Sequence, residues 1–247
     1  MKLSVIIPTY WNSDLCCVHI RESMNSTCVP DEIVVVNDGG DPELRNKLYD
    51  VPRKCNIIYA QIIEDIPWNY NGACNLGIWL SRGDYLTLED VDHIPLRNAY
   101  ENALKVFEEN KELARVGFRR QWVLKSEAVS KPFEEWKPYG GLGTNAMVAM
   151  YKRELHLDMK GQDERMRAYG WLAYCFKARM DKLKAKAVNT NGFYIIKNGE
   201  EPDLQRSMSV ENRRIYKENA NRDHVHGSDG ILNYQFKVER WSPNTAQ

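Results

Sequence analysis

The sequence has 247 residues, long enough for one large domain or two small ones, and its 43% hydrophobic content is that of an ordinary folded protein. Its 34 basic side chains balance 34 acidic ones, so no strong overall field attracts nucleic acid or anionic lipid, although a local basic groove is compatible with that balance. Six cysteines without a C-x-x-C spacing indicate reduced thiols in a cytoplasmic protein. No apolar stretch is long enough for a signal peptide or a membrane span.

Strands and helices are expected to alternate through the first half of the chain. Strands of this length, separated by helices, form βαβ units, so the sheet should be mostly parallel and the loops that follow its strands should share one edge. Ligands bind at that edge in open α/β sheets. The expected strands are residues 3–7, 32–36, 56–63 and the stretch 83–95, and the expected helices are residues 14–24, a short helix from Pro42 capped by Asp41, 71–81 and 96–109.

The pattern changes after residue 110. Two strands are expected on either side of a loop rich in Pro, Gly, Trp and Tyr, which is a candidate lid or acceptor wall. With no repeat and no clear linker, we expect a single domain over 1–247, with a nucleotide-binding half to about 110 and an acceptor half from about 111. The expected elements are strands 114–124, 144–151 and 193–196, a mostly helical 161–186 broken near Gly170, a polar helix 209–219, a loop 223–229 and an irregular tail over the last twenty residues.

A cluster of carboxylates ends the fourth expected strand. Asp90 and Asp92 flank Val91 directly after the apolar residues of that strand. Acidic side chains crowded together repel one another unless a cation lies among them, and oxygen ligands suit Mg²⁺ or Mn²⁺. For an Asp-x-Asp alone, a solvated acidic turn would be the simpler interpretation. A metal site is favoured by the polar strand ends expected at the same sheet edge, which are Thr9 and Tyr10, residues 37–39, and residues 90–92.

Asp38 is a candidate for recognising a nucleotide base. A carboxylate accepts a hydrogen bond from the imide N–H of uracil or thymine but not from the acceptor N3 of cytosine. The alternative is a turn residue before Gly39. Thr9 and Tyr10 could hold base and ribose, or could simply pack. Asn71 and Gly72 stand where backbone can approach a diphosphate at a helix amino end.

Four motifs in order resemble glycosyltransferases of the GT-A fold, closest to family 2. They are residues 4–10 (SVIIPTY), 32–39 (EIVVVNDG), 71–77 (NGACNLG), and 83–85 (GDY) running into 90–92 (DVD). The resemblance implies a Rossmann-like, mostly parallel sheet flanked by helices, with a smaller acceptor-side part. A weaker similarity, to the acceptor-side segment of galactosyltransferase-like members, lies at residues 161–164 (GQDE) and 169–171 (YGW).

The resemblance also implies roles for individual residues. Asp92 would bind the metal directly, Asp90 would reach the ribose, or the metal through water, and a histidine near the carboxyl terminus would complete the metal site. We favour His226 over His224 for this, against two ordinary surface histidines, and His93 could support the acidic pair. The residues expected to bind the donor are Pro8, Thr9, Tyr10, Asp38, Asn71, Gly72, Asn75 and Asp90.

An inverting transfer needs a carboxylate that takes the acceptor's proton. Asp163 is the first candidate and Glu164 the second, although an Asp at this position could equally cap a helix. Three departures from the family pattern concern the site: Asn37 replaces an Asp, Cys74 replaces a frequent Arg that would face the diphosphate, and Leu172-Ala173 stand where Glu-Asp commonly follows YGW.

We therefore expect a metal-dependent transferase that moves a sugar from a UDP- or dTDP-sugar to a hydroxyl of a glycan, a lipid-linked sugar or a small acceptor. One alternative is a phage-type enzyme that glycosylates a hydroxylated DNA base, which the neutral charge disfavours. Another is a nucleotidyltransferase or a sugar-nucleotide-binding module, although the first strand is followed by PTYW (residues 8–11) rather than a basic, glycine-rich loop. Four aromatic residues of the second half could stack on sugars, or could simply pack: Trp122, Trp136, Tyr139 and Trp171.

Overall fold

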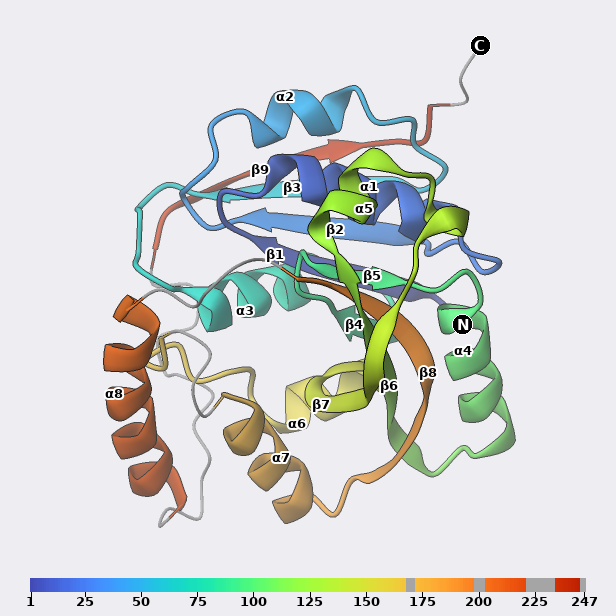
Figure 1. Ribbon diagram of the computed structural model, residues 1–247. Helices are drawn as coiled ribbons and strands as arrows, with labels where there is room; N and C mark the ends of the chain where they lie inside the picture. Colours follow the sequence, from blue (N-terminus) through green and yellow to red (C-terminus); the bar gives the residue numbers. More distant parts are fainter. Residues whose placement is uncertain (168–171, 198–202, 221–233, 245–247) are drawn as a thin grey trace.

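The computed structural model describes residues 1–167, 172–197, 203–220 and 234–244 (Figure 1). In this part of the chain nine strands form one sheet in the order β5-β8-β6-β7-β4-β1-β2-β3-β9. The four strands β4-β1-β2-β3 are parallel, as the alternation of strands and helices predicted. They are β1 (Leu3–Thr9), β2 (Glu32–Asn37), β3 (Asn56–Ile62) and β4 (Tyr85–Leu88).

The second half of the chain extends this sheet beyond β4. Strand β7 (Tyr139–Lys152) runs antiparallel to β4, β6 (Leu113–Leu124) pairs antiparallel with β7, and β8 (Lys186–Lys197) lies parallel to β6. The short strand β5 (His93–Pro95) pairs with β8 at the end of the sheet. At the opposite edge β9 (Phe236–Trp241) pairs antiparallel with β3.

Helices cover both faces of the parallel strands, because those strands are apolar on both faces. Val5 and Ile7 face a core closed by α1 (Ser13–Met24), α2 (Leu44–Tyr49) and α4 (Ala99–Glu109). Ile6 faces the opposite core, to which α3 (Tyr70–Leu80), α6 (Arg153–Asp158), α7 (Leu172–Lys182) and α8 (Asp203–Ala220) contribute. A third, smaller cluster lies beneath α5 (Lys125–Ser130) and the 3-10 turn η1 (Phe133–Glu135).

Helix α3 lies close to the sheet because residue 77 is a glycine. A Cβ at Gly77 would lie 2.3 Å from Cγ2 of Ile6 on β1. This approach brings the amino-terminal turn of α3 to the edge at which the parallel strands end.

Several expected elements differ from the structure. The stretch 83–95 is two strands, β4 and β5, separated by residues 89–92, with a turn at residues 91 and 92. Helix α2 begins at Leu44 rather than at Pro42, and α4 at Ala99 rather than at residue 96. Residues 161–167 are not helical, so the prediction of a mostly helical 161–186 was wrong in its first part. The prediction of an irregular tail over the last twenty residues was also wrong, because this stretch contains β9.

Two simpler expectations concern thiols and membranes. The cysteines whose side chains the structure describes are all free thiols: Cys16, Cys17, Cys28, Cys55 and Cys74. Across the described residues, no helix combines the length and apolar character needed to cross a bilayer.

Candidate active site

The polar ends of β1, β2 and β4 lie at one edge of the sheet. Because β1 lies between its parallel neighbours β4 and β2, Asp90, Thr9 and Asp38 follow each other in that order across the edge. The backbone N–H of Asp38 donates to the Thr9 carbonyl at 3.0 Å. Burial, and then the nearby carboxylates of Asp90 and Asp38, raise the pKa of the Cys74 thiol on α3. Asp38 and Asp90 follow the two strands that flank β1, so both lie at this edge of the sheet.

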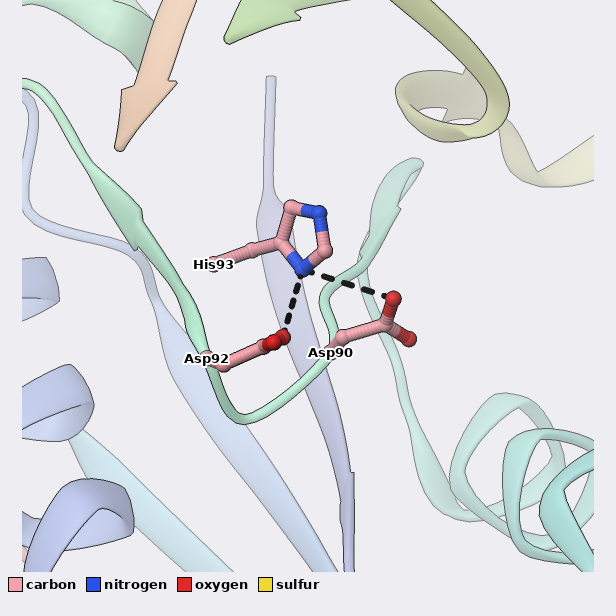
Figure 2. A group of neighbouring side chains, drawn as sticks. All are labelled: Asp90, Asp92 and His93. Carbon is pink, nitrogen blue, oxygen red and sulfur yellow. Dashed lines mark hydrogen bonds and ion pairs between the residues drawn. The ribbon is translucent and has the colours of Figure 1, made fainter. Parts of the chain in front are cut away.

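Asp90, Asp92 and His93 form an acidic cluster with an imidazole at its centre (Figure 2). Nδ1 of His93 lies 2.9 Å from Oδ1 of Asp92 and 3.3 Å from Oδ2 of Asp90. On the other side of the ring, Nη1 of Arg120 on β6 lies 2.5 Å from Nε2. Because a guanidinium can only donate, Nε2 accepts and Nδ1 carries the hydrogen that the two carboxylates share.

The cluster fits a divalent cation. One ligand atom from each of its three residues lies within 4.8 Å of the others. Oδ1 of Asp90 is buried and makes no hydrogen bond. Burial acts to raise the pKa of Asp92, but the hydrogen bond from His93, together with its positive charge when the ring is protonated, outweighs burial and holds that pKa below its ordinary value. The ionised oxygens of Asp90 and Asp92 are a donor set for Mn²⁺ or Mg²⁺.

A buried polar network holds the acidic turn from below. Oε2 of Glu89 lies 2.7 Å from Nε2 of His19 and accepts from the Tyr100 hydroxyl at 3.0 Å. Nδ1 of His19 lies 3.3 Å from the carbonyl oxygen of Val91, between the two aspartates. Glu89, His19 and Tyr100 are at most 1% exposed. Helices α1 and α4 thus fix the turn that carries Asp90 and Asp92.

Asp38 is buried in a second polar network. It is 5% exposed, and its Oδ1 accepts from Nδ2 of Asn69 at 3.1 Å. Arg167 in turn donates to Oδ1 of Asn69. Burial raises the pKa of Asp38 to about 6, partly opposed by the Asn69 hydrogen bond and the Arg167 charge. The carboxylate is thus aligned by an amide but poorly solvated, which favours a partner that donates to it.

The amino-terminal turns of α3 hold the segment 161–167 against the site. Asn71 Nδ2 donates to the carbonyl of Asp163 at 2.8 Å, and Asn75 Nδ2 donates to Oε1 of Glu164 at 2.8 Å. Oδ1 of Asn75 accepts from the backbone N–H of Gln162 at 2.7 Å. These two asparagines, expected to bind the donor, therefore also join α3 to this segment. Oδ1 of Asn71 is buried without a hydrogen-bond partner.

The two candidate bases are both buried. Asp163 is 5% exposed and forms a two-point ion pair with Arg165, at 2.6 Å to Nη2 and 3.0 Å to Nε. It lies in an irregular segment, so it caps no helix. Glu164 is 8% exposed and faces Asn75.

The remaining predicted residues are placed as follows. Pro8 lies within β1, and Oγ1 of Thr9 is buried without a partner at its end. Tyr10 is 45% exposed, and its hydroxyl donates to Asp65 at 3.3 Å. His226, His224 and residues 169–171 lie outside the described residues. Four residues at the site were not predicted: Asn69, Arg120, Arg167 and Tyr234, whose hydroxyl donates to the Gly72 carbonyl at 2.7 Å.

A Rossmann-like sheet, extended by antiparallel strands and carrying acidic residues at its carboxyl edge, is the GT-A fold of nucleotide-sugar-dependent glycosyltransferases. The family model of glycosyl transferase family 2 matches residues 4–181. The chain belongs to this family, which confirms the resemblance seen in the four motifs and makes the chain a glycosyltransferase by class.

The individual proteins to which the chain is similar share little sequence identity with it or match only part of it. An uncharacterized glycosyltransferase of Rickettsia bellii is 32% identical over 109 residues, which are 44% of this chain and 15% of that protein. Residues 1–349 of S. aureus TarS superpose with a TM-score of 0.66 at 18% identity, covering 90% of this chain and 66% of that one. The mannosyltransferase PcManGT from Pyrobaculum calidifontis, in complex with GDP-Man and Mn²⁺, gives 0.61 at 16% identity, covering 94% and 66%. At these identities the structural likeness supports the fold alone.

Proposed function

We propose that this chain transfers a sugar from a uridine or thymidine diphosphate donor to a hydroxyl acceptor, with a divalent cation at the acidic cluster. The observation that carries the proposal is the placement of Asp38 and Asp90 just after β2 and β4, the two parallel neighbours of β1, at one edge of the sheet. A nucleotide diphosphate needs this combination, because one acceptor group reads the base while another site neutralises the phosphates.

The donor would lie along the sheet edge from Asp38 to Asp92. Asp38 would accept the imide N–H of the base, with Thr9 and Tyr10 beside it and Pro8 setting the end of β1. The unpartnered Oδ1 of Asn71 and the backbone of Gly72 at the start of α3 would face the ribose and diphosphate. Asn75 would act through its contacts with the segment 161–167.

Asp90 and Asp92 would hold the cation, with His93 beside them and His226 as the proposed additional ligand. Bound there, Mn²⁺ or Mg²⁺ would neutralise the charge that builds on the departing diphosphate. The chain itself supplies a rigid turn, because Glu89 and His19 fix the backbone between the two aspartates. Arg120 orients the His93 ring so that its N–H faces the carboxylates.

Asp163 and Glu164 remain the proposed bases. For Asp163 to accept a proton, its ion pair with Arg165 would have to open, because both of its oxygens contact that guanidinium. We further propose that residues to about 110 bind the donor and that the remainder positions the acceptor. A cytoplasmic location rests on the reduced thiols alone and stays a prediction.

Known complexes of similar structures support a nucleotide-sugar donor, but they contain different nucleotides and do not select one. S. aureus TarS has been solved in complex with UDP-GlcNAc, with a TM-score of 0.64 and 17% identity, and PcManGT with GDP-Man. The carboxylate of Asp38 favours uracil or thymine over cytosine. A direct comparison of UDP, dTDP, CDP and GDP is therefore the first measurement to make.

The test is binding and hydrolysis of donors by the purified chain. Calorimetry with the four nucleotides should rank UDP or dTDP first, with affinity that depends on Mn²⁺. Release of UDP or dTDP from their sugars should fall at least a hundredfold in Asp92→Asn. The matched control is Asp181→Asn, on the exposed surface of α7, which should behave as the wild type. Full hydrolysis by Asp92→Asn, or no nucleotide binding by the wild type, would refute the proposal.

A further inference from the structure

The exposed aromatic residues of β6 and β7 form a pair beside the acidic cluster. Trp122 is 45% exposed and Tyr139 38%, and their rings meet edge to face with centroids 5.9 Å apart. By contrast, Trp136, the third aromatic described in this region, is 7% exposed and packs with Phe133. From the sequence alone, stacking on sugars and simple packing were equally open for all three residues. In the structure, Trp122 and Tyr139 are exposed and Trp136 is buried.

The pair shares one row of the sheet with His93. His93 on β5 pairs with Ile195 on β8, Ile195 pairs with Trp122 on β6, and Trp122 pairs with Tyr139 on β7. Residues paired across neighbouring strands project to the same face. The Arg120 side chain confirms that face, because it lies two residues before Trp122 and contacts His93.

The spacing also suits an acceptor. Neighbouring strands lie about 4.8 Å apart, so two strand spacings put the backbones of His93 and Trp122 about 10 Å apart. A group seated on the indole would therefore lie beside the cluster at which the donor's diphosphate is proposed to bind.

On one side of the indole, β7 contributes a glycine. Gly140 has φ +76°, and a Cβ there would lie 3.4 Å from Cε3 of Trp122. Cβ atoms at Gly141 and Gly143 would meet nothing within 4 Å. Of these three glycines, only Gly140 lies next to the ring, and it brings no side chain onto it.

We infer that Trp122 and Tyr139 form the acceptor subsite, and that the acceptor is a pyranoside whose C–H face stacks on the indole. This inference rests on the proposed function, since it names the acceptor of the same reaction. A sugar ring presents an apolar face and a polar rim, and an indole in water with a guanidinium nearby complements both. Arg120 supplies that guanidinium, and its Nε is buried without a hydrogen-bond partner.

The experiment separates transfer to a sugar from hydrolysis of the donor. The donor hydrolysed fastest by the wild type is offered with methyl β-D-glucopyranoside, methyl β-D-galactopyranoside or methyl α-D-mannopyranoside, and with glycerol as an acyclic alcohol. Trp122→Ala should raise the KM for the accepted pyranoside about tenfold or more, while donor hydrolysis and donor KM stay unchanged. Trp122→Phe should restore most of the loss.

The matched control is Trp79→Ala. Trp79 is 59% exposed on α3 and also meets another ring, Phe236, edge to face. This variant should transfer as the wild type does. Unchanged pyranoside KM in Trp122→Ala would overturn the inference, as would hydrolysis of the donor with transfer to none of the three pyranosides. If the wild type neither binds nucleotides nor hydrolyses donors, the proposed function itself, on which this inference rests, is refuted instead.

Discussion

Replacing Asp38 by asparagine should stabilise the protein while abolishing donor recognition. The buried carboxylate has a pKa of about 6 against an ordinary value of 3.8. An ionised form that the folded state disfavours destabilises the fold wherever the unfolded chain is ionised. A neutral carboxamide removes that penalty, and its oxygen can still accept the hydrogen bond from Asn69.

The size of the effect follows from the shift. About two pKa units at 1.36 kcal/mol each give about 3 kcal/mol as the largest expected gain at neutral pH. The direction of the pKa shift fixes how stability changes with pH. Because the folded-state pKa is raised, the wild type's free energy of unfolding falls as pH rises from about 4 to about 6 and then levels off. The variant lacks this contribution, so its advantage should grow over the same window.

Urea denaturation of both proteins at pH 4, 5, 6, 7 and 8 measures the difference directly, because other titrating groups are common to both. In parallel, UDP affinity of the wild type should fall, on the order of tenfold, between pH 7 and pH 5, as the carboxylate becomes protonated. The variant should bind UDP weakly at every pH. A stability difference that does not change with pH, or a variant less stable than the wild type at pH 8, would refute the reasoning.

Three further predictions concern packing around the site. Gly77→Ala should lower the free energy of unfolding by about 1–3 kcal/mol in urea, because its Cβ would overlap an isoleucine of β1, while the UDP affinity of the folded protein stays unchanged. Gly72→Ala should weaken UDP binding by calorimetry at least tenfold, because its Cβ would lie 2.3 Å from Oδ1 of Asn69 and would displace that amide; wild-type affinity would contradict this. Glu89→Ala should destabilise by about 3–5 kcal/mol in urea, because it leaves His19 buried without its carboxylate partner; a loss below about 1 kcal/mol would show that the network contributes little.

The amino-terminal half of the fold follows from local sequence because its strands are short, apolar and directly followed by polar residues. Each of β1, β2 and β4 is buried throughout, so the burial pattern and the element coincide. Asp38, Asp90 and Asp92 could be found in the same way, since each stands just after such a strand. Topology alone then brings them to one edge.

The rest of the site depends on contacts between distant parts of the chain. Residues 161–167 have a helical composition, yet asparagine side chains of α3 hold them in an irregular form. Three residues of the site lie outside helices and strands: Asn69, Arg167 and Tyr234. No hydrophobic periodicity in the sequence distinguishes such positions. In β9, residues 236–239 alternate apolar and charged side chains, which is typical of an edge strand but equally of a solvated segment.

The pairing of β9 with β3 has a consequence for how the chain reaches its native state. Nearly 180 residues separate these two strands, so during synthesis the free edge of β3 stays unpaired until β9 has been translated. Unsatisfied N–H and C=O groups on such a border invite pairing with other chains. Completion of this edge of the sheet is therefore one of the last events of folding. The segment that completes it is anchored through Tyr234 to the start of α3.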